Sequence, residues 1–332
     1  MFIEQNFNKL RMSRNLKDYL VISAKGIAMG AADVVPGVSG GTIAFISGIY
    51  EELIATIHNL DLGFFSKWKN EGFIKSWKHY NLTFLLFLFL GIAISILSLA
   101  KIIKWLLLNE PLLLWAFFFG LVLASILFIG KQINQWRPRV WISILLASVL
   151  SYFITIAEPL ASPDSNWYLI FCGFIAIIAM ILPGVSGAFI LLILGAYEKF
   201  ISILNDLRDG ILQMDFTLLK DAIIKFLLIA TGAIIGLKVF SKVLNWMFNN
   251  HKNTTLALLT GFMIGSLNKL WPWKEVLSWR TNSEGIKVPF IERSILPSSF
   301  DGDPRILTVI LFIIIGFLLI LGLERIASKK VN

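Results

Sequence analysis

Charged residues are scarce in this sequence. Asp, Glu, Lys and Arg together make up 15% of its 332 residues, whereas 57% are hydrophobic, and the mean hydropathy is +0.76. Soluble domains usually carry about 25% charged residues. A chain this long and this apolar cannot hide its surface in one soluble core, so we expect the lipid bilayer to be its solvent.

Cysteine and histidine are nearly absent as well. The single cysteine, Cys172, excludes an internal disulfide. The three histidines, His58, His79 and His251, have no metal-ligand spacing, so we predict no metal site. Walker motifs, dinucleotide-binding motifs and a nucleophile with a histidine partner are also missing, which argues against an enzyme and against a cofactor. The net charge of +9 comes from basic residues scattered between apolar runs, which is typical of cytoplasmic loops and not of nucleic-acid binding.

The dominant positive feature is a unit that occurs twice. Pro-Gly-Val-Ser-Gly appears at residues 36–40 and again at 183–187. Twelve of the 25 positions from 36 to 60 are identical to their counterparts from 183 to 207. The identical residues include Pro, Ser, Tyr and Glu, whereas chance matches between two apolar runs would be mostly Leu and Ile. A second stretch continues the match with the pairs Gly91/Gly232, Lys101/Lys242, Trp105/Trp246, Gly120/Gly261 and Ser125/Ser266. The chain is therefore built from an internal repeat.

Each copy consists of a motif segment followed by three apolar helices, so we predict an all-α polytopic membrane protein. Each apolar helix is near the ~20 residues needed to cross ~30 Å of hydrocarbon. After a basic N-terminus at 1–18, the predicted parts of repeat 1 (19–157) are the motif segment 19–60 and helices at 82–107, 112–130 and 139–157. The predicted parts of repeat 2 (166–325) are the motif segment 166–205, helices at 220–247, 254–270 and 305–324, and a loop at 271–304.

The repeated motif breaks its helix. Proline removes a backbone donor and clashes with the preceding turn, and glycine loosens the helix, so the predicted helix-breaking residues are Pro36, Gly37, Pro183 and Gly184. Each arm is then about 12–18 residues long, or roughly 20–25 Å, which is too short to cross the bilayer comfortably. Two arrangements remain: one broken crossing, or a re-entrant hairpin that enters and leaves on the same side.

The charges of the loops favour re-entrant hairpins. With a cytoplasmic N-terminus, this arrangement places the basic segments at 67–78, 131–139 and 251–252 in the cytoplasm together with the basic C-terminus. The acidic loop at 206–215 and the loop at 271–304 are then extracytoplasmic. Each half crosses three times, an odd number, so the second half is inserted upside down. Such inverted repeats are typical of secondary transporters.

The two breaks carry the predicted binding site. Irregular backbone at the bilayer midplane survives only where it lines a cavity or packs against protein. Freed N–H groups, the positive ends of helix dipoles and two serine hydroxyls predict an anion cradle there. The predicted substrate-binding residues are Ser39, Gly40, Gly41, Thr42, Ser186, Gly187, Lys25, Lys101 and Lys242. Ionisable groups inside a membrane are costly, and those predicted to couple protons or ions are Asp33, Glu51 and Glu198.

Each of these roles has a structural alternative. The breaks could be packing kinks, and Asp33 could cap the freed backbone of the first break. Glu51 and Glu198 could be polar caps near the interface, and Lys101 and Lys242 could extend toward the lipid headgroups. The residues predicted to lie in an aromatic belt at the membrane–water interface are Trp271, Trp273 and Trp279.

The first motif also resembles that of a known family. Residues 30–42, Gly-Ala-Ala-Asp-Val-Val-Pro-Gly-Val-Ser-Gly-Gly-Thr, with their echo at 183–187, resemble the bacterial polyprenyl-phosphate transporter family. The resemblance covers nearly the whole chain, because both repeats and the helix count fit. The second copy departs from the pattern after its core, where Ala188 and Phe189 replace the first copy's Gly41 and Thr42.

This resemblance implies a flippase of the bacterial cytoplasmic membrane, with membrane lipids as its surroundings. The expected substrate is undecaprenyl phosphate, returned from the outer to the inner leaflet for reuse in cell-envelope synthesis. A phosphomonoester carries about −1.5 to −2 charges. Moving it into a cell that is negative inside costs about 2.3 kcal/mol per charge per 100 mV, so inward movement benefits from co-transported protons or cations.

Other readings stay open at this point. A transporter of a small soluble anion would use the same cradle, but in a cavity closed to lipid. A membrane enzyme acting on a polyprenyl phosphate would need a nucleophile or an acid–base pair at the cradle, and the histidines lie in loops or near their ends. The sequence is also compatible with a homo-oligomer.

Overall fold

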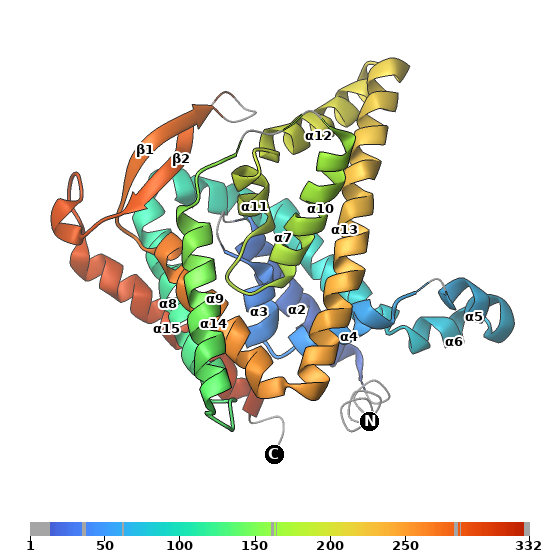
Figure 1. Cartoon of the computed structure of the whole chain (residues 1–332), viewed down its shortest axis with the longest axis horizontal. Coiled ribbons are helices and arrows are strands. Elements are labelled where there is room, and N and C mark those ends of the chain that lie inside the picture. The colour runs from blue at the N-terminus through green and yellow to red at the C-terminus, as the bar shows by residue number, and fades with distance from the viewer. Residues whose placement is uncertain are drawn as a thin grey trace.

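Among the described residues, the regular secondary structure is helical apart from one two-stranded β-hairpin (Figure 1). The computed structural model describes residues 14–34, 38–61, 63–160, 163, 165–281, 285 and 287–328. The helices of the first half are α2 (Leu16–Asp33), α3 (Gly40–Ile46), α4 (Tyr50–Asn59), α5 (Gly63–Glu71), α6 (Phe73–His79), α7 (Leu82–Asn109), α8 (Pro111–Gly130) and α9 (Pro138–Ile156). Those of the second half are α10 (Asn166–Ile181), α11 (Gly187–Ile193), α12 (Tyr197–Leu212), α13 (Phe216–Asn250), α14 (Lys252–Leu270) and α15 (Ile306–Ser328).

Six long helices coincide with the six apolar stretches of the sequence. They are α7, α8 and α9 in the first half and α13, α14 and α15 in the second. Among the described residues, α7, α8, α9 and α13 are long and apolar enough to span a membrane, and the bent pair α11–α12 is a fifth candidate. The helix α14 is largely buried in protein, with Thr255 and Thr260 among its buried residues. A helix that faces protein instead of lipid can keep such polar groups.

The helices of the two halves pack in matching pairs. The helix α2 lies along α7, and α10 lies along α13 in the same way. Gly26 and Gly173 permit these crossings, because a Cβ atom at either position would overlap the backbone of the partner helix. The helix α8 lies along α15, and α14 lies along α9, so the second helix of each half packs against the third helix of the other. The halves are thus intertwined.

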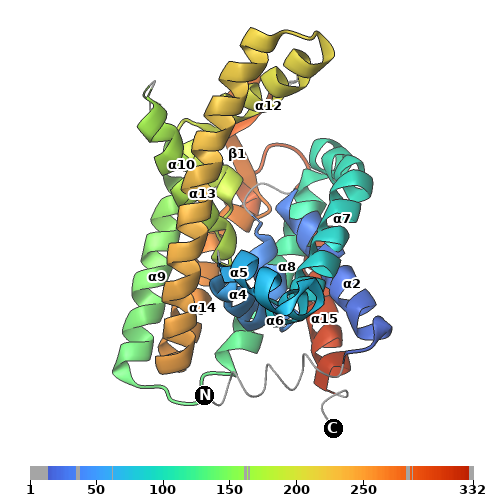
Figure 2. The ribbon, with the colours of Figure 1, turned by 90° about the vertical axis from the view of Figure 1, so that its right-hand side faces the viewer.

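The two ends of the molecule differ in charge. Figures 1 and 2 show α12 and the β-hairpin at one end, and the α8–α9 and α13–α14 connections with the end of α15 at the other. The connections at the second end carry the basic residues Lys131, Arg137, Arg139 and Lys252. The segment that includes α12 and leads into α13 carries Asp206, Asp209 and Asp215. Two of the basic segments that the sequence assigns to the cytoplasm, 131–139 and 251–252, therefore share one end of the fold.

Each motif segment bends a second time after its break. Between α3 and α4 the chain turns at Gly48, whose φ is +74°, and between α11 and α12 it turns at Gly195, whose φ is +64°. These two glycines occupy matching positions of the repeat, and the left-handed backbone explains why both copies keep a residue without a Cβ atom. The helices α11 and α12 meet at 111°.

The β-hairpin lies between α14 and α15 and adds to the predicted all-α fold. Its strands β1 (Lys274–Thr281) and β2 (Lys287–Ser294) are antiparallel. Trp273, just before β1, is 4% exposed, and its indole Nε1 donates to the Pro304 carbonyl at 2.9 Å. The prediction of an interfacial aromatic belt is wrong for Trp273, because this side chain packs inside the protein beside α8 and α15. Trp279 is 59% exposed.

Candidate functional site where the two breaks meet

The two helix breaks contact each other directly. Ser39 precedes α3. Its hydroxyl donates toward two backbone carbonyls of the second half, with the Oγ 3.2 Å from the Met180 oxygen and 3.3 Å from the Leu182 oxygen. The same oxygen accepts the Gly41 N–H at 3.1 Å. One hydroxyl of the first half therefore serves both its own helix start and the backbone at the end of α10.

Two further side chains of the first half bind the second break. The Thr42 Oγ1 accepts the Gly184 N–H at 2.9 Å, and the Tyr50 hydroxyl donates to the Ile181 carbonyl at 3.0 Å. Thr42 and Tyr50 are buried, with 1% and 2% exposure. A backbone that leaves its helix inside a membrane protein needs such partners, because an unpaired buried N–H or carbonyl group is costly.

Asp33 closes the first break from within its own half. It is the last residue of α2, and its Oδ1 accepts the Gly40 N–H at 2.6 Å. A Cβ atom at position 40 would overlap the Asp33 carboxylate, so glycine is required for this contact. The geometry is that of the capping alternative considered above. A negative charge of the protein itself occupies the start of α3, where the sequence predicts the charge of a substrate.

The predicted anion cradle is therefore filled by the protein in this conformation. The N–H groups of Gly40, Gly41 and Gly184 are bound by Asp33, Ser39 and Thr42. The expectation that these donors are free is revised, because side chains from both sides of the break reach them. In the second break the chain leaves the helix at Ile181 and resumes it at Gly187, passing through Pro183 and Gly184. Pro36 and Gly37 of the first break lie outside the described residues.

A narrow cavity with a volume of about 10 Å³, which is room for about one water molecule, adjoins the second break. It is lined by Ser186 and Gly184 of the break, by Ser151 and Thr155 of α9, and by Phe189 and Lys269. Ser186 stands before the start of α11, as Ser39 stands before α3. A Cβ atom at Gly187 would lie 2.7 Å from the Ala176 carbonyl, so α11 starts in close contact with α10.

The three predicted lysines do not gather at the breaks. The Lys25 Nζ donates to the Ser47 carbonyl at 2.6 Å, at the far end of α3 from Gly40. Lys101 and Lys242 are exposed on α7 and α13. Their positions agree with the alternative in which lysines extend toward the headgroups.

The two matched glutamates form ion pairs with residues outside the motif segments. Glu51, at the start of α4, pairs with Lys252 at 2.7 Å. Glu198, at the start of α12, pairs with Arg280 of β1. Each pair joins a motif segment to another part of the fold. This geometry fits a structural role in holding these parts together better than a role in proton transfer.

Comparisons with known proteins show the family of the chain. The model of a family described as undecaprenyl phosphate translocase-like (VCA0040-like) matches residues 29–288, which include both breaks. The chain belongs to this family. It is 41% identical over 322 residues to a polyprenyl-phosphate transporter of Vibrio cholerae serotype O1, covering 96% of this chain and 100% of that protein. It is 30% identical over 260 residues to a polyprenyl-phosphate transporter of Staphylococcus aureus, covering 75% of this chain and 84% of that protein. No solved structure matches the chain.

Sequence reasoning missed two buried charge clusters of this translocase-like protein. In the first, Arg14 binds both carboxylate oxygens of Glu52, at 2.6 and 2.7 Å, and the Asn81 side-chain amide donates to Glu52 at 2.9 Å. The second joins Lys269 and Glu292 at 3.1 Å. In the sequence, Lys269 lies at the end of a predicted membrane helix, where a lysine is common and draws no attention. The partners of both clusters are also far apart in the sequence. Only the alternation of polar and apolar residues in β1 could have signalled the hairpin.

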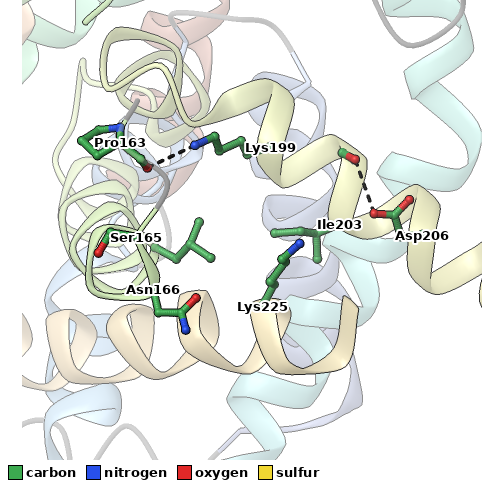
Figure 3. Close-up of a pocket in the computed structure, with 9 residues that line it drawn as sticks. Pro163, Ser165, Asn166, Lys199, Ile203, Asp206 and Lys225 are labelled. Atoms are coloured by element: carbon green, nitrogen blue, oxygen red, sulfur yellow. Dashed lines mark hydrogen bonds between the residues drawn. The ribbon is translucent and has the colours of Figure 1, made fainter. Parts of the chain in front are cut away.

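A further pocket lies apart from both breaks. It has a volume of about 320 Å³ and is formed by the start of α10, by α12 and by α13 (Figure 3). Lys199 donates to the Pro163 carbonyl across its edge, and Lys225 pairs with Asp221 at 2.6 Å. Within the described chain, no three His, Cys, Asp or Glu side chains converge to hold a metal ion.

Proposed function

We propose that the protein moves a polyprenyl phosphate, undecaprenyl phosphate in bacteria, between the leaflets of the cytoplasmic membrane. Both curated relatives are polyprenyl-phosphate transporters, and they cover most of this chain. The observation that carries the proposal is the contact between the breaks. Ser39 and Thr42 of one half hold the backbone of the other at the centre of a largely apolar fold.

The proposed architecture is a pair of inverted repeats. The exchanged helix pairs α8–α15 and α14–α9 support it, as do the basic connections gathered at one end. In this arrangement α2 with α3 and α4 forms a re-entrant hairpin from the cytoplasmic side, and α10 with α11 and α12 forms one from the extracytoplasmic side. The positive-inside rule assigns the basic end and both termini to the cytoplasm.

In the proposed mechanism, the phosphate replaces contacts that the breaks make with each other. The Ser39 hydroxyl and the N–H groups of Gly40 and Gly184 are the kinds of donor that phosphate oxygens bind. When no substrate is present they remain satisfied within the protein, so the bilayer interior never meets an unpaired polar group. The polyprenyl tail stays in lipid while the headgroup passes.

Asp33 is the proposed coupling residue. Its carboxylate must leave the Gly40 N–H before a phosphate dianion can approach, and a proton taken up by Asp33 removes the competing charge. Glu51 and Glu198 are less suited to this task, because each is already paired with a cation. Inward movement of the dianion against a negative interior then draws on the accompanying proton.

The test is transport by the purified protein in liposomes. Fluorescent or radiolabelled undecaprenyl phosphate is incorporated, and its exposure on each leaflet is followed with and without a pH gradient. The proposal predicts faster exchange than in protein-free liposomes, and faster inward exchange with a gradient. Exchange no faster than in protein-free liposomes would overturn the flippase proposal. Uptake of free phosphate without lipid exchange would favour the small-anion transporter, and release of phosphate from the lipid would favour an enzyme.

A further inference from the structure

Three charged side chains are buried together beneath the β-hairpin. Lys269 ends α14, Lys274 begins β1 and Glu292 lies in β2. The Glu292 Oε2 lies 3.1 Å from the Lys269 Nζ and 3.7 Å from the Lys274 Nζ. Their side chains are 14% exposed for Lys269, 7% for Lys274 and 16% for Glu292. Two amines therefore share one carboxylate in a setting of low dielectric constant.

Lys274 lacks a hydrogen-bond partner among the described residues. The 3.7 Å to Glu292 is too long for a hydrogen bond, and the amine instead lies 3.3 Å above the Trp115 ring of α8. Burial lowers the pKa of Lys274 to about 7, against the opposing attraction of Glu292. Buried amines are usually paired, so Lys274 is held here without the hydrogen-bonded partner that such a group normally has.

Lys269 connects the cluster to the second break. It lines the narrow cavity that also contains Ser186, Ser151 and Thr155, and its Nζ lies 4.8 Å from the centre of the Phe189 ring. The cavity therefore presents one cation, three hydroxyl groups and the backbone of a broken helix. Phosphate monoesters are bound by this combination of groups.

We propose that Lys269, Lys274 and Glu292 form a counter-ion exchange site for a phosphate monoester at the second break. As the break opens, the cavity widens from its volume of about 10 Å³. The phosphate oxygens then bind Lys269 beside Ser186, and Glu292, released from Lys269, pairs with Lys274. Each charge keeps a partner throughout, and the amine without a hydrogen bond gains one. This inference rests on the proposed function, to which it adds the residues that receive the headgroup at the hairpin end.

The site belongs to one half only. Counting from the matched pair Ser125 and Ser266, the position of Lys269 corresponds to Phe128 in the first half. The connection between α8 and α9 is also short and carries no hairpin. The first break is closed instead by Asp33, which has Met180 as its counterpart in the second. The two breaks thus differ in the charge they offer a phosphate, with a lysine at the hairpin end and a carboxylate at the other break.

The experiment measures binding of farnesyl phosphate, a short polyprenyl phosphate, to the purified full-length protein in detergent. Farnesol and inorganic phosphate are measured in parallel. The variants are Lys269→Gln, Lys269→Arg and Glu292→Gln, and Arg293→Gln, which removes an exposed ion pair with Glu275 in the same hairpin, is the control. Each variant is first checked for a monodisperse elution profile and for its thermal unfolding temperature.

The proposed site predicts that neutralising Lys269 and neutralising Glu292 change the affinity for farnesyl phosphate in opposite directions. Lys269→Gln lowers the affinity for farnesyl phosphate about 10-fold or more, as expected for a lost charged hydrogen bond, and Lys269→Arg retains most of it. Glu292→Gln raises the affinity several-fold, because the competing carboxylate is gone. Arg293→Gln leaves it unchanged, and farnesol binds weakly to every variant.

Two results would overturn the site. One is unchanged affinity in a folded Lys269→Gln variant. The other is a loss of affinity in Glu292→Gln as large as in Lys269→Gln, which would mean that the cluster only holds the hairpin in place. Either result leaves the proposed function standing if the wild-type protein still exchanges undecaprenyl phosphate in liposomes. Inorganic phosphate bound as tightly as farnesyl phosphate, with the same loss in Lys269→Gln, would support the site but count against a lipid as its ligand.

Discussion

The contact between the breaks predicts a specific effect of Thr42→Val. Valine has nearly the shape of threonine but cannot accept the Gly184 N–H, which Thr42 binds at 2.9 Å. Thr42 is 1% exposed, so water cannot replace the lost acceptor while the breaks stay closed. Leaving a buried donor without a partner costs about 1–3 kcal/mol. The equilibrium constant for opening the breaks should therefore rise about 5- to 150-fold.

Cys172 supplies a natural probe of this opening. It is the single cysteine of the chain, it is fully buried in α10, and Leu191 of α11 and Ala196 after it pack in the same cluster. If α11 moves when the breaks separate, a maleimide reagent reaches the thiol. The labelling rate follows the open population as long as closing is faster than labelling.

Thr42→Val should accelerate Cys172 labelling by about 5- to 150-fold over the wild-type protein. The matched control is Thr83→Val, which removes a hydroxyl that accepts the Trp77 Nε1 hydrogen at 2.9 Å far from either break. Its labelling rate should stay at the wild-type value. Equal rates for Thr42→Val and the wild type, at equal thermal stability, would refute the claim that this hydrogen bond holds the breaks together.

Three further predictions concern other parts of the site. Asp33→Asn should abolish the acceleration of lipid exchange by a pH gradient, whereas Asp221→Asn, in an exposed pair on α13, should retain it in the same liposome assay. Burial lowers the pKa of Lys274 to about 7, so the unfolded chain binds the extra proton between pH 7 and about 10. The unfolding temperature in detergent should thus rise with pH across that window, and Lys274→Met should flatten this rise. Gly41→Ala should lower the unfolding temperature by several degrees, because its Cβ atom would lie 2.7 Å from the Ile181 carbonyl.

Local chemistry explains what the sequence could predict. Proline and glycine disrupt a helix wherever they occur, so the doubled motif located the break at residues 183–184 without knowledge of its neighbours. Hydrophobic length located the six long helices in the same way. Gly48 and Gly195 occupy matching positions of the repeat, and both adopt a left-handed backbone.

Long-range pairing explains what the sequence could not predict. The Ser39 hydroxyl reaches the Met180 carbonyl only after both halves have folded against each other. Without that partner, the N–H groups of the breaks look free for a ligand, whereas Asp33, Ser39 and Thr42 in fact bind them. The charge of Lys25 likewise looks available, but the Ser47 carbonyl holds it.

The most direct test of the central claim joins the two breaks covalently. Ser39→Cys and Leu182→Cys are combined in a Cys172→Ser background, since the Ser39 Oγ lies 3.3 Å from the Leu182 carbonyl. Exchange of undecaprenyl phosphate in liposomes is measured before cross-linking, after cross-linking with a short thiol reagent, and after reduction. If the headgroup passes between the breaks, cross-linking stops exchange and reduction restores it. Full-rate exchange by the cross-linked protein would contradict a passage between the breaks.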